Sequence, residues 1–261
     1  MTKVNIASVT TAFAVMLLLT SIVLRITNGT AELFFQSATL VAILVLISLL
    51  ATWRDLFGTK NMLFLFLVSY VLITLFLMLG TYYGWPFGYF QYTDLLGYKL
   101  MGIVPWTLPI FWTLAIATLL PLIRNLTTPR QDTKEHLFTW AFDVAIATTI
   151  LFLFIEPVLL ATGIKLQAQT SNLIGASVQS YLGIFITTFV VTALLVGRIY
   201  TTPPVWKSTR YLTIFTIFIL GYVLTLAILF KLTLASLIGI ICILWLAWRQ
   251  MRLETKTSYA Y

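Results

Sequence analysis

Long apolar stretches separated by short polar segments repeat along the whole chain. They occupy residues 6–25, 34–53, 62–83, 100–123, 137–162, 178–199, 211–230 and 232–249, and Lys231 alone separates the last two. A helix that rises 1.5 Å per residue needs about 20 residues to cross the roughly 30 Å hydrocarbon core of a bilayer. The pattern therefore predicts an all-α, polytopic membrane helix bundle of about eight transmembrane helices.

The amino-acid composition excludes a soluble globular protein. Hydrophobic residues make up 60% of the chain and charged residues only 9%, whereas soluble domains carry about 25% charged residues. No soluble domain or low-complexity tract interrupts the apolar pattern, so we expect one integral membrane domain over residues 1–261. The first apolar stretch is longer than the core of a signal peptide, and we expect it to be a retained helix.

Lysine and arginine residues divide unequally between the two sides of the predicted bundle. One side receives twelve of them, and the other receives Arg25, Lys99, Lys165 and Lys231. Because cytoplasmic loops carry the excess of positive charge, both termini are predicted to be cytoplasmic, and segments 26–33, 84–99 and 163–177 to face outward. We expect a multi-pass protein of the cell membrane, in a prokaryote the plasma membrane. The basic residues form no single patch, so no nucleic-acid partner is expected.

Two acidic residues, Asp143 and Glu156, fall inside an apolar segment. An ionised side chain at mid-membrane costs about 2.5–3.5 kcal/mol, so such residues are candidates for function. They are about 20 Å apart along a helix and cannot form one dyad. Asp143 lies near the cytoplasmic end, where a loop partner is a sufficient explanation. Glu156 lies near the outer loops and is the stronger candidate for proton chemistry.

An aromatic and glycine-rich stretch, GWPFGYFQYTDLLGYKL, covers residues 84–100. Trp and Tyr commonly form a belt at the membrane interface, but a belt requires neither three glycines nor the carboxylate of Asp94. The alternative is an aromatic-walled mouth for a long apolar ligand, in which Asp94 and tyrosine hydroxyls orient that ligand. The sequence leaves both interpretations open.

Motifs for metal and nucleotide binding are absent from the sequence. It contains no HExxH, CxxC, Walker loop or GxGxxG, and it lacks the paired Asp-rich motifs that hold a diphosphate through magnesium. We therefore expect neither a metal nor a cofactor.

Two segments in the middle of the chain carry distinctive residue patterns. The first is a run of glycines and aromatic residues followed by a proline-containing stretch that ends on Trp, and its characteristic positions are Phe87, Gly88, Tyr89, Tyr92, Thr93, Gly97, Pro105, Pro109 and Trp112. The second contains Glu156-Pro157 and the stretch from Gly175 to Gly183. At these positions both segments resemble an integral-membrane carotenoid biosynthesis family, which includes carotenoid 1,2-hydratases and bisanhydrobacterioruberin hydratases. The second segment differs from the family in having Ser180 in place of Asn, Ile164, Lys165 and Leu166 in place of a Trp-x-Trp pair, and Ile184 in place of Trp.

The resemblance implies a hydratase (a hydro-lyase) that adds water to the terminal double bond of an acyclic carotenoid. Under that hypothesis Glu156 or Asp94 supplies the proton, and the other carboxylate, with Ser180 or Tyr181, orients the water. The faces of aromatic side chains would stabilise the cation, and the apolar substrate would enter from the lipid. The substrate-binding residues predicted are Trp85, Phe87, Tyr89, Tyr92, Trp112, Ser180 and Tyr181.

Two alternative functions would use the same residues as hydration. Cyclisation or isomerisation of the polyene end uses the same protonation but ends in loss of a proton. A membrane protein that only binds or carries a carotenoid or another isoprenoid needs the aromatic pocket without the acid. The sequence separates neither alternative from hydration, and it predicts no oligomeric state.

Overall fold

The computed structural model describes residues 31–127, 134–167, 174–199 and 206–258. The predicted helix over 6–25 lies outside the described residues, as do both chain termini. Within the described part, six helices are long and apolar enough to cross a membrane. They are α2 (Ala31–Tyr83), α3 (Thr107–Thr127), α4 (Lys134–Ala161), α5 (Val178–Ile199), α6 (Trp206–Leu229) and α7 (Thr233–Ser258). The predicted all-α, polytopic membrane bundle is confirmed.

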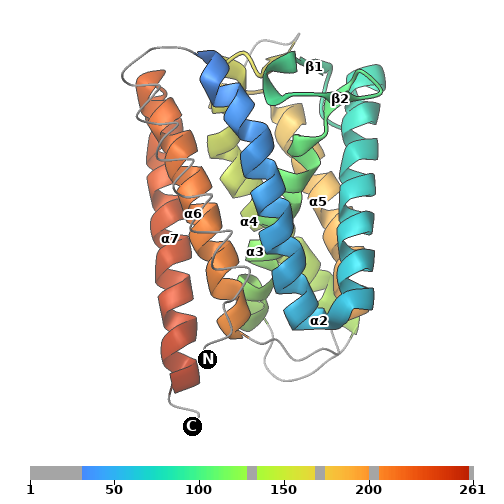
Figure 1. Cartoon of the computed structure of the whole chain (residues 1–261), viewed down its shortest axis with the longest axis vertical. Coiled ribbons are helices and arrows are strands. Elements are labelled where there is room, and N and C mark those ends of the chain that lie inside the picture. Colours follow the sequence, from blue (N-terminus) through green and yellow to red (C-terminus); the bar gives the residue numbers. More distant parts are fainter. Residues whose placement is uncertain (1–30, 128–133, 168–173, 200–205, 259–261) are drawn as a thin grey trace.

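Helix α2 consists of two helical arms that meet at Gly58. As one straight helix its 53 residues would extend about 80 Å, far more than a bilayer core. Gly58 has φ of 79° and ψ of 163°, a backbone conformation that side-chain-bearing residues rarely adopt. The chain reverses there, and Figure 1 shows the two arms running in opposite directions. The two arms correspond to the predicted separate segments 34–53 and 62–83.

Helix α3 lies in the middle of the bundle, with the other helices around it (Figure 1). In an apolar 18-residue stretch of each helix, 83% of the residues are buried in α3, against 28% in α2 and 33% in α7. The outer helices expose large apolar side chains such as Leu67, Ile241 and Leu244, which suits contact with lipid. The close helix pairs are α4 with α5, α6 with α7, and α2 with α3.

Two short strand pairs lie at one end of the bundle, which we call the loop end (the described parts of residues 84–106 and 162–177). Strand β1 (Phe90–Tyr92) pairs antiparallel with β4 (Lys165–Gln167), so that Tyr92 lies opposite Lys165. Strand β2 (Lys99–Leu100) pairs with β3 (Val104–Pro105), and a 3-10 turn, η1, spans Asp94–Leu96. The pairing confirms that segments 84–99 and 163–177 meet at the same end (Figure 1).

The start of the fourth apolar segment was predicted wrongly. Residues 100–106 belong to the β2–β3 hairpin, which turns through Met101 and Gly102 with φ of 50° and 71°, and α3 begins only at Thr107. Pro105 therefore lies outside the helix. Pro109 falls in the first turn, where a missing N–H is tolerated because it has no helical partner there.

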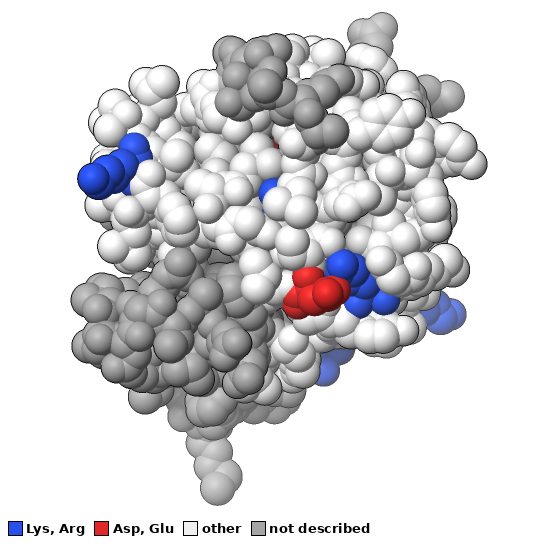
Figure 2. Space-filling model, turned by 90° about the horizontal axis from the view of Figure 1, so that it is seen from above, with Lys and Arg blue, Asp and Glu red and all other residues white. Residues whose placement is uncertain are grey.

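Arginine residues gather at the opposite end, which we call the basic end (Arg54, Arg124, Arg198 and Arg249). The Nε of Arg198 donates to Asn61 Oδ1 at 3.0 Å, and this bond ties α5 to the turn of α2. The loop end, in contrast, shows only a few charged groups on a mostly uncharged face (Figure 2). The described part of the bundle thus has one basic end, as the sequence predicts.

Candidate functional site

A buried cluster of Glu156, Lys165 and Ser180 lies just below the loop end. Lys165 Nζ is 2.7 Å from Glu156 Oε1 and 3.0 Å from Ser180 Oγ, and Ser180 Oγ is 2.9 Å from the same Oε1. The three residues are 4%, 1% and 0% exposed. A buried ion pair is stable only where hydrogen bonds satisfy the remaining polar groups. The three contacts among Glu156, Lys165 and Ser180 provide most of the hydrogen bonds that these groups need.

Three different elements hold the cluster together. Glu156 lies in the last turns of α4, and Ser180 lies in the first turn of α5, where its N–H donates to Ser177 Oγ at 3.1 Å. Lys165 is the first residue of β4, whose side chains alternate, so that Lys165 points inward while Leu166 is 53% exposed. The pairing of β4 with β1 therefore turns the ammonium group into the bundle.

Within the described structure, only one of the two carboxylate oxygens of Glu156 accepts hydrogen bonds. Glu156 Oε1 accepts from both Lys165 and Ser180, and Lys165 Nζ also lies 4.4 Å from the centre of the Phe90 ring. Glu156 Oε2 is buried and has no hydrogen-bond partner within the described structure. The cluster consequently offers one free acceptor.

Aromatic rings form a wall beside the cluster. Phe87 packs edge-on against Phe90 at 5.8 Å and against Trp112 at 6.0 Å, and Phe90 packs against Tyr92 at 5.2 Å. The wall can form because Gly183 of α5 leaves the space, which a Cβ there would share with the Phe87 ring. Burial, and secondarily the charge of Glu156, raises the pKa of Tyr92 well above its usual value. Tyr92 therefore keeps its proton and serves as a neutral ring.

An apolar cavity of about 150 Å³, lined in part by Trp112, lies between α2, α3, α4 and α6. Ile155 and Ile164, the chain neighbours of Glu156 and Lys165, both line it. Among its lining residues only Trp112, Thr216 and Tyr222 have a polar group in the side chain, and none is charged. The cavity thus suits a hydrocarbon group. Trp112 belongs to both the aromatic wall and the cavity lining. Its ring packs against that of Phe152, another lining residue, with ring centres 4.8 Å apart.

An open hollow of about 330 Å³ lies on the loop-end surface. Its lining includes Phe90 from β1, Tyr89 just before that strand, and Leu166 and Gln167 from β4. Phe90 borders both this hollow and the ammonium group of Lys165. The Phe90 ring therefore connects the cluster with the loop-end surface.

The predicted site residues are divided between the interior and the surface. Phe87, Tyr92, Trp112, Ser180 and Tyr181 are buried, whereas Trp85 and Tyr89 are each 56% exposed.

Asp94 lies on the surface, with a side chain that is 91% exposed and forms an ion pair with Lys99 at 2.8 Å. The structure brings Glu156 to Ser180 but gives Asp94 a different partner. The catalytic roles of both acids stay predictions.

Sequence reasoning missed Lys165 as a site residue. In the sequence, Lys165 stood out only as a basic residue on the side predicted to face outward and as part of the segment that replaces the family's Trp-x-Trp pair. Two signals pointed to it: a single Lys between Ile164 and Leu166, and an intramembrane acid nine residues earlier in the chain.

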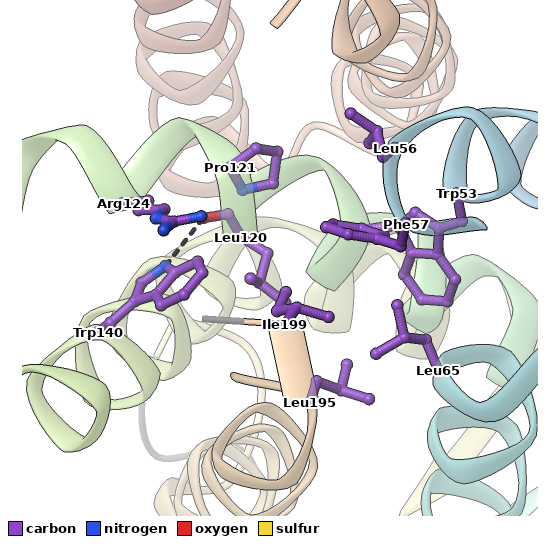
Figure 3. A pocket seen from close by; sticks show the side chains of 11 residues that line it. Trp53, Leu56, Phe57, Leu65, Leu120, Pro121, Arg124, Trp140, Leu195 and Ile199 are labelled. Atoms are coloured by element: carbon purple, nitrogen blue, oxygen red, sulfur yellow. Dashed lines mark hydrogen bonds between the residues drawn. The ribbon is translucent and has the colours of Figure 1, made fainter. Parts of the chain in front are cut away.

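A second pocket lies at the basic end (Figure 3), between Trp53 of α2, Arg124 of α3 and Trp140 of α4. Its volume is only about 20 Å³, enough for little more than one water molecule. Trp140 Nε1 donates to Leu120 O at 2.9 Å, and Arg124 lies 5.1 Å from the Trp140 ring centre. The pocket is too small for an organic substrate, so the loop end is the better candidate site.

A family model described as carotenoid biosynthesis protein matches residues 34–246. No curated protein and no solved structure matches the chain. The matched region includes the aromatic wall, the cavity and all three residues of the buried cluster. The chain therefore belongs to the carotenoid biosynthesis protein family, and it is a membrane protein with a role in carotenoid biosynthesis.

Proposed function

We propose that this protein adds water to the terminal C=C bond of an acyclic carotenoid. The observation that carries the proposal is the buried Glu156–Lys165 ion pair, at 2.7 Å, next to an aromatic wall and an apolar cavity. Burying such a pair inside a membrane protein costs desolvation free energy, and intramembrane ionisable groups mark sites of function.

Hydration needs three things from the protein. A proton must reach one carbon, the tertiary cation formed on the other carbon must be stabilised, and a water molecule must be delivered to that cation. Aromatic faces such as those of Trp112 and Tyr92 would stabilise the cation, each by on the order of 0.5–2 kcal/mol. The buried carboxyl group of Glu156 would transfer the proton or orient the water.

The cavity fits one end of a carotenoid rather than the whole molecule. Its volume of about 150 Å³ is below the roughly 300–1,000 Å³ of pockets that enclose drug-sized ligands. The rest of the polyene would lie in the lipid along the apolar outer surface of the helices. The substrate therefore enters from the bilayer, and only its reacting end leaves the lipid.

The protein would lie in the cell membrane as a multi-pass protein, with the basic end in the cytoplasm. The excess of Lys and Arg at that end supports this orientation. The loop end, with its hollow of about 330 Å³, then faces outward and supplies the water.

Binding without catalysis is the second candidate function. One observation favours it: no charged side chain lines the apolar cavity, so Glu156 is beside the cavity and not part of its lining. A carotenoid end bound in this cavity would reach the carboxylate only if lining side chains moved.

The test is expression in a bacterium that produces lycopene, followed by mass spectrometry of the extracted pigments. Hydration predicts a new pigment heavier by one water, absent from cells that carry Glu156→Gln. A matched control is Asp55→Asn, a carboxylate at the basic end that pairs with Arg54. A new pigment of unchanged mass would indicate cyclisation or isomerisation, and unchanged lycopene that co-purifies with the protein would indicate a binding protein.

A further inference from the structure

The donors of the buried cluster are fully used. A lysine ammonium has three N–H groups, and Lys165 directs them at Glu156 Oε1, at Ser180 Oγ and at the face of the Phe90 ring. The hydroxyl of Ser180 accepts from Lys165 and donates to Glu156 Oε1. No donor in the cluster is left to bind a ligand.

One acceptor, by contrast, is unused. Glu156 is 4% exposed, and its Oε2 lacks a hydrogen-bond partner among the described residues. A buried carboxylate oxygen without a donor is unfavourable, since it has lost its water and gained nothing in return. The geometry therefore calls for a small molecule that donates a hydrogen bond and accepts none from this cluster.

We infer that Lys165 is a positioning residue that keeps Glu156 ionised, and that Glu156 Oε2 binds the O–H group of a water molecule. The ammonium, at 2.7 Å, forms a charge-assisted hydrogen bond with the carboxylate. The inference deepens the proposed function, on which its catalytic meaning rests. In a hydratase, Glu156 first takes up one proton from solvent and transfers it to the alkene carbon. The bound water then adds to the cation and gives up a proton to Glu156, which releases it on returning to the ionised resting state.

Water and hydrocarbon would approach the cluster from different sides. The surface hollow borders Phe90, the ring that contacts Lys165. The apolar cavity borders Ile164, whose neighbour Lys165 points to the cluster instead. In the proposal, water would come to Oε2 from the side of the hollow, and the hydrocarbon from the side of the cavity.

The protonation state can be tested by infrared spectroscopy of the purified protein in lipid at neutral pH, without substrate. The difference between wild type and Glu156→Gln should contain the stretching band of an ionised carboxylate and no band of a protonated carboxyl group. In a Lys165→Met background the same Glu156→Gln difference should move to the protonated band, and Lys165→Arg should restore the ionised one. A protonated band in the wild type would overturn the inference.

The bound water can be tested in the same samples by exchanging ordinary water for heavy-oxygen water. A shifted O–H stretching band should appear in the wild type and in the control Asp55→Asn, and should be lost in Glu156→Gln. If the band persists in Glu156→Gln, Oε2 does not bind the water and the inference fails.

Loss of fold is controlled by the double variant Lys165→Met/Glu156→Gln, which removes both charges and leaves no buried ion unpaired. Its helical content should match the wild type. Because these readouts need no substrate, their failure is distinguishable from failure of the hydration assay. Unchanged lycopene together with both infrared bands would reject hydration while supporting the water site.

Discussion

Both ends of the bundle bury a cation, but they stabilise it in different ways. At the loop end Lys165, 1% exposed, pairs with the carboxylate of Glu156. At the basic end Arg249, 6% exposed, donates from Nε to the backbone oxygen of Leu122 at 3.0 Å. That oxygen lies near the end of α3, where the helix dipole is negative.

The difference favours the loop end as the place for proton chemistry. A backbone carbonyl is a permanent dipole and cannot take up a proton, so the Arg249 contact has a structural role. A carboxylate can take up a proton, and Glu156 still has one free oxygen. The pocket at the basic end is also far smaller, about 20 Å³ against about 150 Å³ for the apolar cavity.

The first prediction sharpens the comparison by assigning each end to a side of the membrane. Tyr98→Cys places a thiol at the loop end, where Tyr98 is 77% exposed, and Lys60→Cys places one at the turn of α2. In intact cells a membrane-impermeant maleimide should label Tyr98→Cys and leave Lys60→Cys unlabelled until the cells are opened. Cys242 is buried, so the wild type gives a low background. The reverse labelling pattern would invert the topology.

The second prediction compares carboxylates. Glu156→Gln should lower formation of the hydrated pigment by about 10²–10⁴-fold, the usual effect of losing a group that transfers a proton. Asp94→Asn should have a smaller effect, since its side chain is 91% exposed and paired with Lys99. Pigment ratios at matched protein levels provide the measurement. Equal losses in both variants would mean that Asp94 shares the chemistry.

The third prediction compares the two buried cations. Lys165→Met should lower the free energy of unfolding by about 3–5 kcal/mol, because buried Glu156 loses its ion-pair partner and must take up a proton to stay buried. Arg249→Met should cost about 1.5–3 kcal/mol, the value of one hydrogen bond from a charged group. Unfolding in detergent with added denaturant measures both. A larger loss in Arg249→Met would contradict the comparison.

The fourth prediction concerns two glycines of α5, one near each end. Gly183→Ala should destabilise the protein by about 1–3 kcal/mol, because its methyl group would overlap the Phe87 ring. Gly197→Ala, which has nothing within 4 Å of the new Cβ, should be neutral or stabilise by up to about 1 kcal/mol. Thermal unfolding of both variants checks the difference. Similar melting temperatures would show that Phe87 moves aside.

The sequence predicted the helical spans well because each depends on local composition. Runs of about 20 apolar residues identify a membrane helix without knowledge of its neighbours. Even the narrow break at Lys231 was found, and the chain turns there with a φ of 56°. The boundary of α3 failed because residues 100–106 are apolar enough for a helix, yet Pro105 and the turn at Met101–Gly102 favour a hairpin.

The site was predictable only in part. Glu156 could be singled out because an acid in an apolar segment is rare, and Ser180 because of the resemblance to the family. Lys165 lies only nine residues after Glu156, but its side chain is turned inward by the pairing of β1 with β4, which joins residues more than 70 positions apart. Such a long-range contact leaves no periodic signal in the sequence. The exposure of Asp94 likewise depends on how η1 and β2 fold, which its sequence neighbours do not reveal.

The most direct test of the central claim is to grow lycopene-producing cells that express this protein in heavy-oxygen water and to weigh the pigment by mass spectrometry. A hydratase centred on Glu156 predicts a product that has gained one water and carries the heavy oxygen, present with the wild type and absent with Glu156→Gln. A product that forms equally well with Glu156→Gln, or lycopene that stays unmodified with the wild type, would contradict the account.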